Sequence, residues 1–349
     1  MTVPTPLTSA RPAPPLPTHV RLTIGVIARN GLPFLNDCLA SLPTHGALGG
    51  VLQIVLVDCA SDDGTTAVML DFARSRRDTR VFRVDGTANA AVARNVVLDN
   101  AGPGYLLLLD GDFVLEPDFP ARAFQYIERG EAAAVAGTYR EQLFDAENRP
   151  LGDVGWRHPP PAEPHPVRLT GGSIFLGPMA RALNLRYDEH QRICEDWDFS
   201  LRTSAHCRIL RVPEPVGTHL THHYFSAKRW RSFYTDVRPR ILGQLLRKHL
   251  AHPSCLASLL LSERGMALGG AMQVLAIAGL TTGTPWLTGL AVMILGADAT
   301  RQLLKAPSAE RGIRVAHWVS TRLPSPWMLV LGLIRPKPHQ PKYSVRPIH

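Results

Sequence analysis

Residues 105–113 read Tyr-Leu-Leu-Leu-Leu-Asp-Gly-Asp-Phe, an apolar run that ends in two carboxylates, Asp110 and Asp112. The run has the length and composition of a buried β-strand, and in an extended chain residues two apart point to the same face. Two carboxylates on one face can share a divalent cation that also binds phosphate oxygens. The stretch therefore predicts a metal and phosphate site at a strand end. The alternative is an ordinary acidic turn, which is common after strands.

Upstream of this stretch, short apolar runs alternate with segments of helical periodicity. We predict strands at residues 22–28, 53–58, 80–84 and 105–109, and helices at residues 34–42, 66–74 and 90–101. Such alternation requires crossover connections, so the predicted fold class is α/β, with a Rossmann-like, mostly parallel sheet flanked by helices. Ligands of such sheets bind beyond the carboxyl ends of the strands, where Asn30, Asp58 and Asp110 lie. We expect these three residues to border one nucleotide pocket.

The alternation weakens after Pro120. Further short strands are predicted at residues 133–138, 171–175 and 208–212, whereas the proline-rich segment 145–166 is predicted to be a loop over the surface or over the site. The α/β domain is expected to span residues 21–227.

Composition narrows the cellular setting. The net charge is +9 and the pI about 9.7, which suits nucleic acid, an anionic membrane or an anionic substrate. No nucleic-acid motif is visible, so nucleic acid is not an expected partner. Five cysteines without a Cys-x-x-Cys pair indicate neither a disulfide framework nor a zinc site and favour a reducing compartment. Residues 1–20 are proline-rich and are interpreted as a disordered arm, not as a signal peptide.

The last third of the chain has a different character. Basic and apolar residues interleave from Lys228, which suits either a helix in a headgroup layer or a solvated helix packed on the domain. Segments 266–280 and 286–295 are uncharged but short of a bilayer span, so a membrane hairpin, a re-entrant pair and a buried helical pair all stay open. Basic residues flank these segments, which favours membrane association of residues 228–334 with both ends cytoplasmic. The expected location is therefore the cytoplasmic face of the inner membrane. Residues 324–334 are a further candidate interfacial anchor, and residues 335–349 a basic tail.

Four blocks, in this order, resemble family 2 glycosyltransferases. They are Val57-Asp-Cys-Ala-Ser-Asp-Asp-Gly-Thr65, Ala91-Val-Ala-Arg-Asn95, the 105–112 stretch, and Cys194-Glu-Asp-Trp-Asp-Phe199, which is preceded by Gly171-Gly-Ser173. The resemblance is to bacterial members with the GT-A fold and a hydrophobic, membrane-associated C-terminal region. It covers residues 21–230.

The resemblance assigns roles on the donor side. It implies that Asn30, Asp58, Arg94 and Asp110 bind the nucleotide sugar, and that Asp110 and Asp112 hold Mg or Mn. An acceptor-only carboxylate at Asp58 suits the imide N–H of uracil, and the planar cation of Arg94 suits a diphosphate or a base. A plain capped turn would explain Asp63 to Thr65 but not an Asp at the strand end. An arginine taken singly, as at position 94, is more often part of a surface ion pair.

On the acceptor side, the resemblance makes Asp196 the general base that takes the proton of the acceptor hydroxyl. Glu195 is expected to hold this base or to contact the acceptor, Trp197 to stack on a sugar, and Gly172 to line the site. Asp198 is four residues before Arg202, so this pair is expected to be a structural ion pair within a helix. The alternative for the whole cluster is an acidic helix start.

Two histidines, His219 and His222, are candidate metal ligands. Their spacing is compatible with one face of a helix, and a lone histidine is otherwise a satisfied core residue.

Departures from the family pattern limit the interpretation. Residues 26–30 lack the usual proline and aromatic, and Cys59 replaces a second acid, so the nucleotide is not identified. Ser226 stands where processive synthases have Gln before the Arg-Trp pair, which favours a single transfer.

The predicted function is therefore metal-dependent, inverting sugar transfer from a nucleotide-sugar donor to a saccharide or lipid-linked acceptor, in cell-surface polysaccharide or glycolipid synthesis. The alternatives are a nucleotidyltransferase, although residues 28–33 lack the glycine-rich basic loop, and a membrane-anchored sugar-binding protein without turnover.

Overall fold

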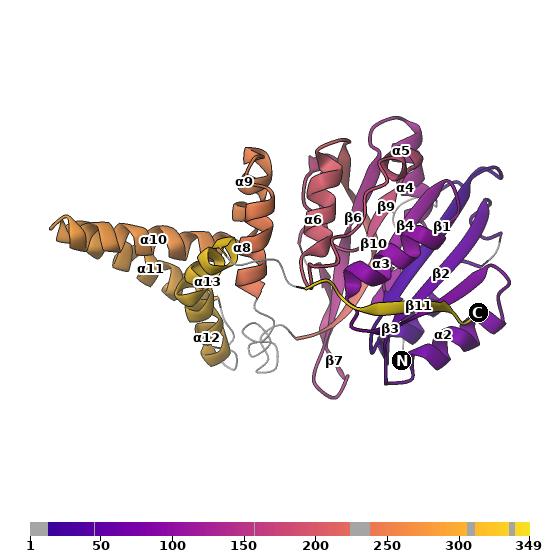
Figure 1. Cartoon of the computed structure of the whole chain (residues 1–349), viewed down its shortest axis with the longest axis horizontal. Helices are drawn as coiled ribbons and strands as arrows, with labels where there is room; N and C mark the ends of the chain where they lie inside the picture. Colours follow the sequence, from indigo (N-terminus) through magenta and orange to yellow (C-terminus); the bar gives the residue numbers. More distant parts are fainter. Residues whose placement is uncertain (1–12, 45, 157, 224–237, 306–310, 335–338) are drawn as a thin grey trace. The chain divides into compact units, whose positions relative to one another are not determined.

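The computed structural model describes residues 13–44, 46–156, 158–223, 238–305, 311–334 and 339–349. It divides into two compact units, coloured along the chain in Figure 1. The sheet unit contains the chain up to His222 together with His339–His349, and the helical unit contains His223–Pro338.

The first half of the sheet unit alternates strands with helices as predicted. Its elements are β1 (Arg21–Ala28), α1 (Phe34–Ala40), β2 (Val51–Cys59), α2 (Thr65–Arg74), β3 (Thr79–Gly86), α3 (Ala90–Asn100) and β4 (Tyr105–Asp110). The four strands lie parallel in the order β3-β2-β1-β4. This confirms the crossover topology inferred from the alternation.

The second half adds antiparallel strands, so the sheet is mixed and the prediction of a mostly parallel sheet is confirmed for the first half alone. Its elements are β5 (Phe113–Leu115), α4 (Phe119–Glu128), β6 (Ala134–Phe144), β7 (Pro150–Trp156), β8 (His165–Val167), β9 (Ile174–Leu176), α5 (Pro178–Ala182), α6 (Glu195–Ser204) and β10 (Ile209–His222). The order continues β4-β9-β6-β10-β5, with β9 antiparallel to both neighbours and β10 parallel to β6. The segment predicted to be a loop contains β7 and β8, which pair with β6 and β10.

The central strands are apolar throughout because both faces of the sheet are covered. Alternate residues of β4 belong to two different core clusters, Leu107 on one side and Leu106 and Leu108 on the other. A strand buried on both faces is a near-continuous apolar run, as residues 105–109 are. Helix α3 lies so close to β1 that a Cβ on Gly25 would be 2.2 Å from Val97 Cγ1.

The two ends of the chain depart from the predicted boundaries. Leu16 and Val20 are buried in the core of the sheet unit, so the described part of the N-terminal arm is ordered. The predicted basic tail includes β11 (Tyr343–Pro347), which pairs antiparallel with β3 and lies along it in Figure 1. Sequence analysis did not anticipate this strand, because it is short and separated from the rest of the sheet by the helical unit.

The described part of the helical unit consists of helices. These are α8 (Arg238–Lys248), α9 (Pro253–Ser262), α10 (Arg264–Thr281), α11 (Pro285–Leu304), α12 (Arg311–Arg322) and α13 (Pro324–Ile334). Helix α8 packs on α13 through glycines: a Cβ on Gly243 would be 2.0 Å from the Leu329 carbonyl oxygen, and one on Gly332 would be 2.0 Å from that of Arg240.

The predicted apolar segments 266–280 and 286–295 lie in α10 and α11, which pack on each other, and segment 324–334 is α13. Within the described residues, no helix combines the length and the apolar character needed to cross a bilayer.

Candidate active site

The strand register brings the predicted nucleotide residues to one edge of the sheet. Ala28 at the end of β1 lies opposite Asp58 on β2, and Ile27 lies opposite Asp110 on β4. These are carboxyl ends of parallel strands, where ligands of such sheets bind.

Arg94 is the centre of a buried cluster at this edge. It lies on α3, its side chain is only 4% exposed, and it donates to Asp110 Oδ1 at 2.6 Å and to Glu195. Its guanidinium also lies over the ring of Tyr187. Burial lowers the pKa of Arg94, but Asp110 and Glu195 outweigh it and raise the pKa, so the side chain stays a cation.

The expected contact of Arg94 with the nucleotide stays a prediction. In the structure its Nη1 and Nη2 donate to Glu195 and Asp110, and its side chain is only 4% exposed. Arg94 thereby positions Asp110 and Glu195, whose segments are far apart in sequence. The predicted contact of Glu195 with the base or the acceptor also stays a prediction.

Gly172 fits tightly beside this cluster. A Cβ at this position would lie 2.1 Å from Arg94 Nη2 and 2.7 Å from Asp110 Oδ2. At Gly171 the nearest atom to a Cβ is Asp196 Oδ2, at 4.0 Å. Gly172 thus lies against the Arg94 cluster, and the preceding residue, Gly171, lies near Asp196.

Asp196 lies in the first turn of α6, which begins after Cys194 in the left-handed region at φ 60°. Acidic residues are favourable there because the helix N-terminus carries partial positive charge. Asp196 Oδ1 accepts from the Trp197 backbone N–H at 2.8 Å. Burial and the neighbouring charge of Glu195 raise the pKa of Asp196 to about 7, although Arg94 acts in the opposite direction. A carboxyl with this pKa exchanges protons near neutral pH, as a general base must.

The other residues of this turn agree with the sequence analysis in part. Asp198 is fully buried and paired with Arg202 at 2.7 Å, which confirms the structural ion pair. Trp197 is partly exposed beside Asp196. Its stacking on a sugar stays a prediction.

Asp112 belongs to a second cluster, together with His219 on β10 and Glu141 on β6. His219 Nε2 lies 3.2 Å from Asp112 Oδ2, and its Nδ1 lies 3.4 Å from Glu141 Oε1. Burial lowers the pKa of His219, but the two carboxylates prevail and raise it to about 9. Asp110 and Asp112 therefore have different protein partners. The predicted sharing of a single cation stays a prediction.

The pairing of His219 with His222 on one helical face was wrong. Both residues lie on the strand β10, where residues three apart point to opposite faces. The ring of His222 contacts Phe34, and its Nε2 lies 3.0 Å from Asn148 Oδ1. His219 is the histidine that faces Asp112.

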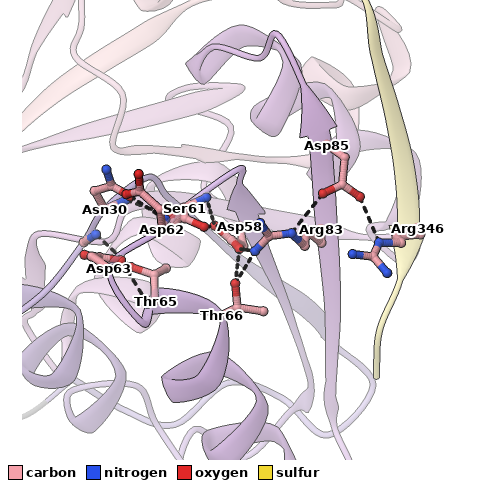
Figure 2. A network of polar contacts seen from close by, with 11 residues as sticks. Asn30, Asp58, Ser61, Asp62, Asp63, Thr65, Thr66, Arg83, Asp85 and Arg346 are labelled. Atoms are coloured by element: carbon pink, nitrogen blue, oxygen red, sulfur yellow. Dashed lines mark hydrogen bonds and ion pairs between the residues drawn. The ribbon is translucent and has the colours of Figure 1, made fainter.

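Asp58 and Asn30 hold the loop that follows β2 (Figure 2). Asp58 accepts from the Ser61 N–H at 3.1 Å, from Thr66 and from Arg83 at 2.6 Å. The side chain of Asp58 has 0% exposure, so the predicted direct contact with a base is not available to it here. Asn30 is exposed, and its Oδ1 accepts from the Asp62 N–H at 3.0 Å.

Sequence analysis missed Arg83 and Glu141. Arg83 follows Val81 and Phe82 in β3 and is 22% exposed at its side chain, whereas Glu141 lies between Arg140 and Gln142 in β6 and is 9% exposed. A charged residue inside a buried strand requires a partner, and this was the available signal. The sequence does not say which distant carboxylate or histidine that partner is.

The residues at the edge of the sheet fit a divalent cation only in part. Asp112 Oδ1 is buried and has no hydrogen-bond partner, and such an oxygen suits a cation. In the described part of the chain, no three or more His, Cys, Asp or Glu side chains are arranged to enclose a metal. A magnesium-type ion needs only one or two carboxylates from the protein when substrate phosphates and water complete its shell.

Comparison with known proteins agrees with this geometry. Residues 23–190 match the family described as Glycosyl transferase family 2. The matched region is slightly less than half of the chain, and it contains the strands and helices from β1 to α5. The enzyme class is accordingly glycosyltransferase, and the mixed sheet flanked by helices fits the GT-A fold.

Solved structures of similar fold include the mannosyltransferase PcManGT from Pyrobaculum calidifontis in complex with GDP-Man and Mn2+. The identity is 16%, 92% of this chain and 87% of that chain are covered, and the TM-score is 0.50. S. aureus TarS 1–349 in complex with UDP-GlcNAc is 14% identical, with 87% of this chain and 91% of that chain covered and a TM-score of 0.46.

A longer TarS chain is 15% identical, with a TM-score of 0.45. The match covers 67% of this chain but only 44% of that one. None of the curated proteins compared with the chain matches its sequence.

The fit around Gly172 gives a matched pair of variants. Gly172→Ala should lower kcat/KM by about 100-fold, because the added methyl displaces Arg94 from Asp110 and a shift of about 1 Å at a site can cost that much. Gly171→Ala should stay within about threefold of wild type, because its methyl meets only ordinary contacts. Initial rates of donor consumption measure both, with circular dichroism as the check on folding. Equal losses in the two variants would contradict the tight fit at Gly172.

The raised pKa of Asp196 predicts a pH dependence. A base must be ionised to accept a proton, and below its pKa of about 7 Asp196 is protonated. The value of kcat/KM should therefore rise with pH, reach half of its maximum near neutrality and level off above it. Rates across about pH 5 to 9 test this. The assignment fails if the profile is flat, or if Asp196→Asn keeps the same transition.

Proposed function

We propose that this glycosyltransferase moves a single sugar from a nucleoside diphosphate donor to a hydroxyl of a saccharide or to a lipid-linked acceptor, with inversion at the anomeric carbon. A role in the synthesis of cell-surface polysaccharide or glycolipid follows from acceptors of this kind. The main support for the proposal is one observation. Arg94 is ion-paired with Asp110 and Glu195 close to Asp196, at the carboxyl ends of the parallel strands.

On the attacking side, Asp196 is the proposed base. It takes the proton of the acceptor hydroxyl while the hydroxyl oxygen forms its bond to the anomeric carbon. The bond from that carbon to the diphosphate breaks, and the diphosphate leaves with the electron pair. Attack opposite the leaving group inverts the configuration. The raised pKa of Asp196 and its place beside Gly171 support this role.

On the departing side, Asp110 and Asp112 are the proposed ligands of Mg or Mn, with His219 as a further candidate. A bound divalent cation would neutralise charge on the diphosphate. The unpartnered oxygen of Asp112 supports this assignment. The GDP-Man and Mn2+ in the PcManGT complex are ligands of the class we propose. Arg94 keeps Asp110 in place by its ion pair.

Two variants separate the donor side from the acceptor side. Asp112→Ala should abolish detectable donor binding in calorimetry with MnCl2 and a panel of nucleoside diphosphate sugars. Asp196→Asn should bind the donor normally and lose about 100-fold or more in kcat, because it lacks the base. Asp71→Asn is the control, because Asp71 is an exposed carboxylate on α2. Unchanged donor affinity in the Asp112 variant would overturn the metal assignment.

We also propose that the helical unit binds the cytoplasmic face of the inner membrane. Residues 223–338 contain 15 lysines and arginines and four aspartates and glutamates, a net charge of +11, so the rest of the chain is slightly acidic. Apolar side chains of this unit that are more than half exposed include, on α10 and α11, Val274, Leu280, Trp286, Val292 and Met293. Basic charge together with exposed apolar residues suits an anionic bilayer surface.

Vesicle cosedimentation tests this proposal. The full chain should bind vesicles with about one-third anionic lipid, and should bind neutral vesicles more weakly. Val292→Glu with Met293→Glu should weaken binding about tenfold or more, because two charges replace apolar contacts. Val51→Glu, an exposed valine of the sheet unit, is the control. Equal sedimentation with and without vesicles would rule the proposal out.

A further inference from the structure

The loop between β2 and α2 borders the proposed donor site and has a strained backbone. Ala60 has φ 57° and Asn30, which contacts the same loop, has φ 51°. This region is unfavourable for a residue such as alanine and is tolerated better by asparagine, so surrounding contacts must hold Ala60 there. The Asn30 N–H donates to Ser61 Oγ at 2.9 Å, and Asn30 Oδ1 accepts from the Asp62 N–H.

Arg83, on the neighbouring strand β3, holds this loop in place by its hydrogen bonds. It donates to Asp58, to Thr66 and, at 3.2 Å, to the carbonyl oxygen of Ser61. Asp58 in turn accepts from the Ser61 N–H. The position of the guanidinium therefore decides where Ser61 lies.

Asp85 holds Arg83, and the C-terminal strand holds Asp85. Arg83 Nε donates to Asp85 Oδ1 at 2.9 Å, and Arg346 Nε donates to Asp85 Oδ2 at 2.9 Å. Figure 2 shows these contacts as one continuous chain from Asp58 to Arg346. Arg346 lies directly opposite Arg83 in the register of β11 and β3. Two like charges in such a pair repel, so the carboxylate between them is what makes the arrangement favourable.

The same strand reaches the other side of the site through Tyr343. Its hydroxyl donates to Glu189 Oε1 at 2.9 Å, and the same oxygen accepts from Asn95 Nδ2 at 2.9 Å. Asn95 follows Arg94 on α3 and also donates to the Tyr187 carbonyl oxygen at 3.0 Å. The two ends of β11 thus contact the supports of the loop after β2 and of the Arg94 cluster.

We infer that β11 is a positioning element of the donor site, and that Arg346 acts on donor binding through Asp85 and Arg83. The inference rests on the proposed function, because it assumes that a nucleoside diphosphate binds beside the loop after β2. Arg346 is 61% exposed at its side chain and is not a catalytic residue. Its effect is expected on the affinity for the donor and not on the chemical step.

The test compares Arg346→Ala and Arg346→Lys with Arg149→Ala in the full chain. Arg149 is a matched control: its side chain is 72% exposed, and it pairs with Asp145 at 2.7 Å, away from this network. The probes are UDP and GDP, each with MnCl2, by calorimetry, followed by steady-state kinetics with the sugar donor of whichever nucleotide binds.

Arg346→Ala should weaken nucleotide binding and raise the KM for the donor about threefold to tenfold, with kcat within about twofold. Arg346→Lys should recover part of the affinity, because it keeps the charge. Arg149→Ala should bind as wild type does. An unchanged nucleotide affinity in Arg346→Ala, with or without a lower Tm, overturns the inference, because the strand would then be only structural. If wild type binds neither nucleotide, the proposed function fails first and the inference with it.

Discussion

The buried cation of Arg94 is the constraint around which the site is organised. A guanidinium with so little exposure is tolerable only when carboxylates take its charge and its hydrogen bonds. Asp110 comes from the end of β4 and Glu195 from the start of α6, 101 residues away from Arg94 in sequence. The ion pairs therefore bring the proposed base, which follows Glu195, to the edge of the sheet. They also explain why position 172 is glycine, since any side chain there would occupy the space of the guanidinium.

The two halves of the mixed sheet contribute different residues to the candidate site. The parallel half, β3-β2-β1-β4, contributes the loop after β2 and the carboxylate of Asp110, which border the proposed donor site. The second half contributes His219 from β10 and Glu141 from β6 to the surroundings of Asp112. Because β10 hydrogen-bonds to both β6 and β5, His219 is fixed beside the end of the 105–113 stretch. Neither half alone contains the complete set of candidate residues.

The sequence was most informative where the determinants were local. Alternating apolar and helical segments predicted β1 to β4 with their helices, and the spacing of Asp198 and Arg202 predicted their ion pair. It was misleading where a short pattern suits two structures, as for His219 and His222: their spacing suits one face of a helix, but both residues lie on a strand. Partners far apart in sequence could not be inferred: the neighbours of Arg94, the burial of Asp58 against Arg83, and the antiparallel strands β7, β8 and β11 all depend on contacts formed only in the folded chain.

The path of the chain through β11 has a consequence for where this protein can be divided. The sheet unit is assembled from two separate stretches, with the whole helical unit inserted between β10 and β11. A polypeptide that stopped at His222 would contain every proposed catalytic residue, yet it would leave the hydrogen-bonding groups of β3 without their neighbour. Open strand edges of this kind recruit other chains. His339–His349 therefore cover this edge of β3, and a division of the protein that keeps the sheet unit whole must keep β11 with it.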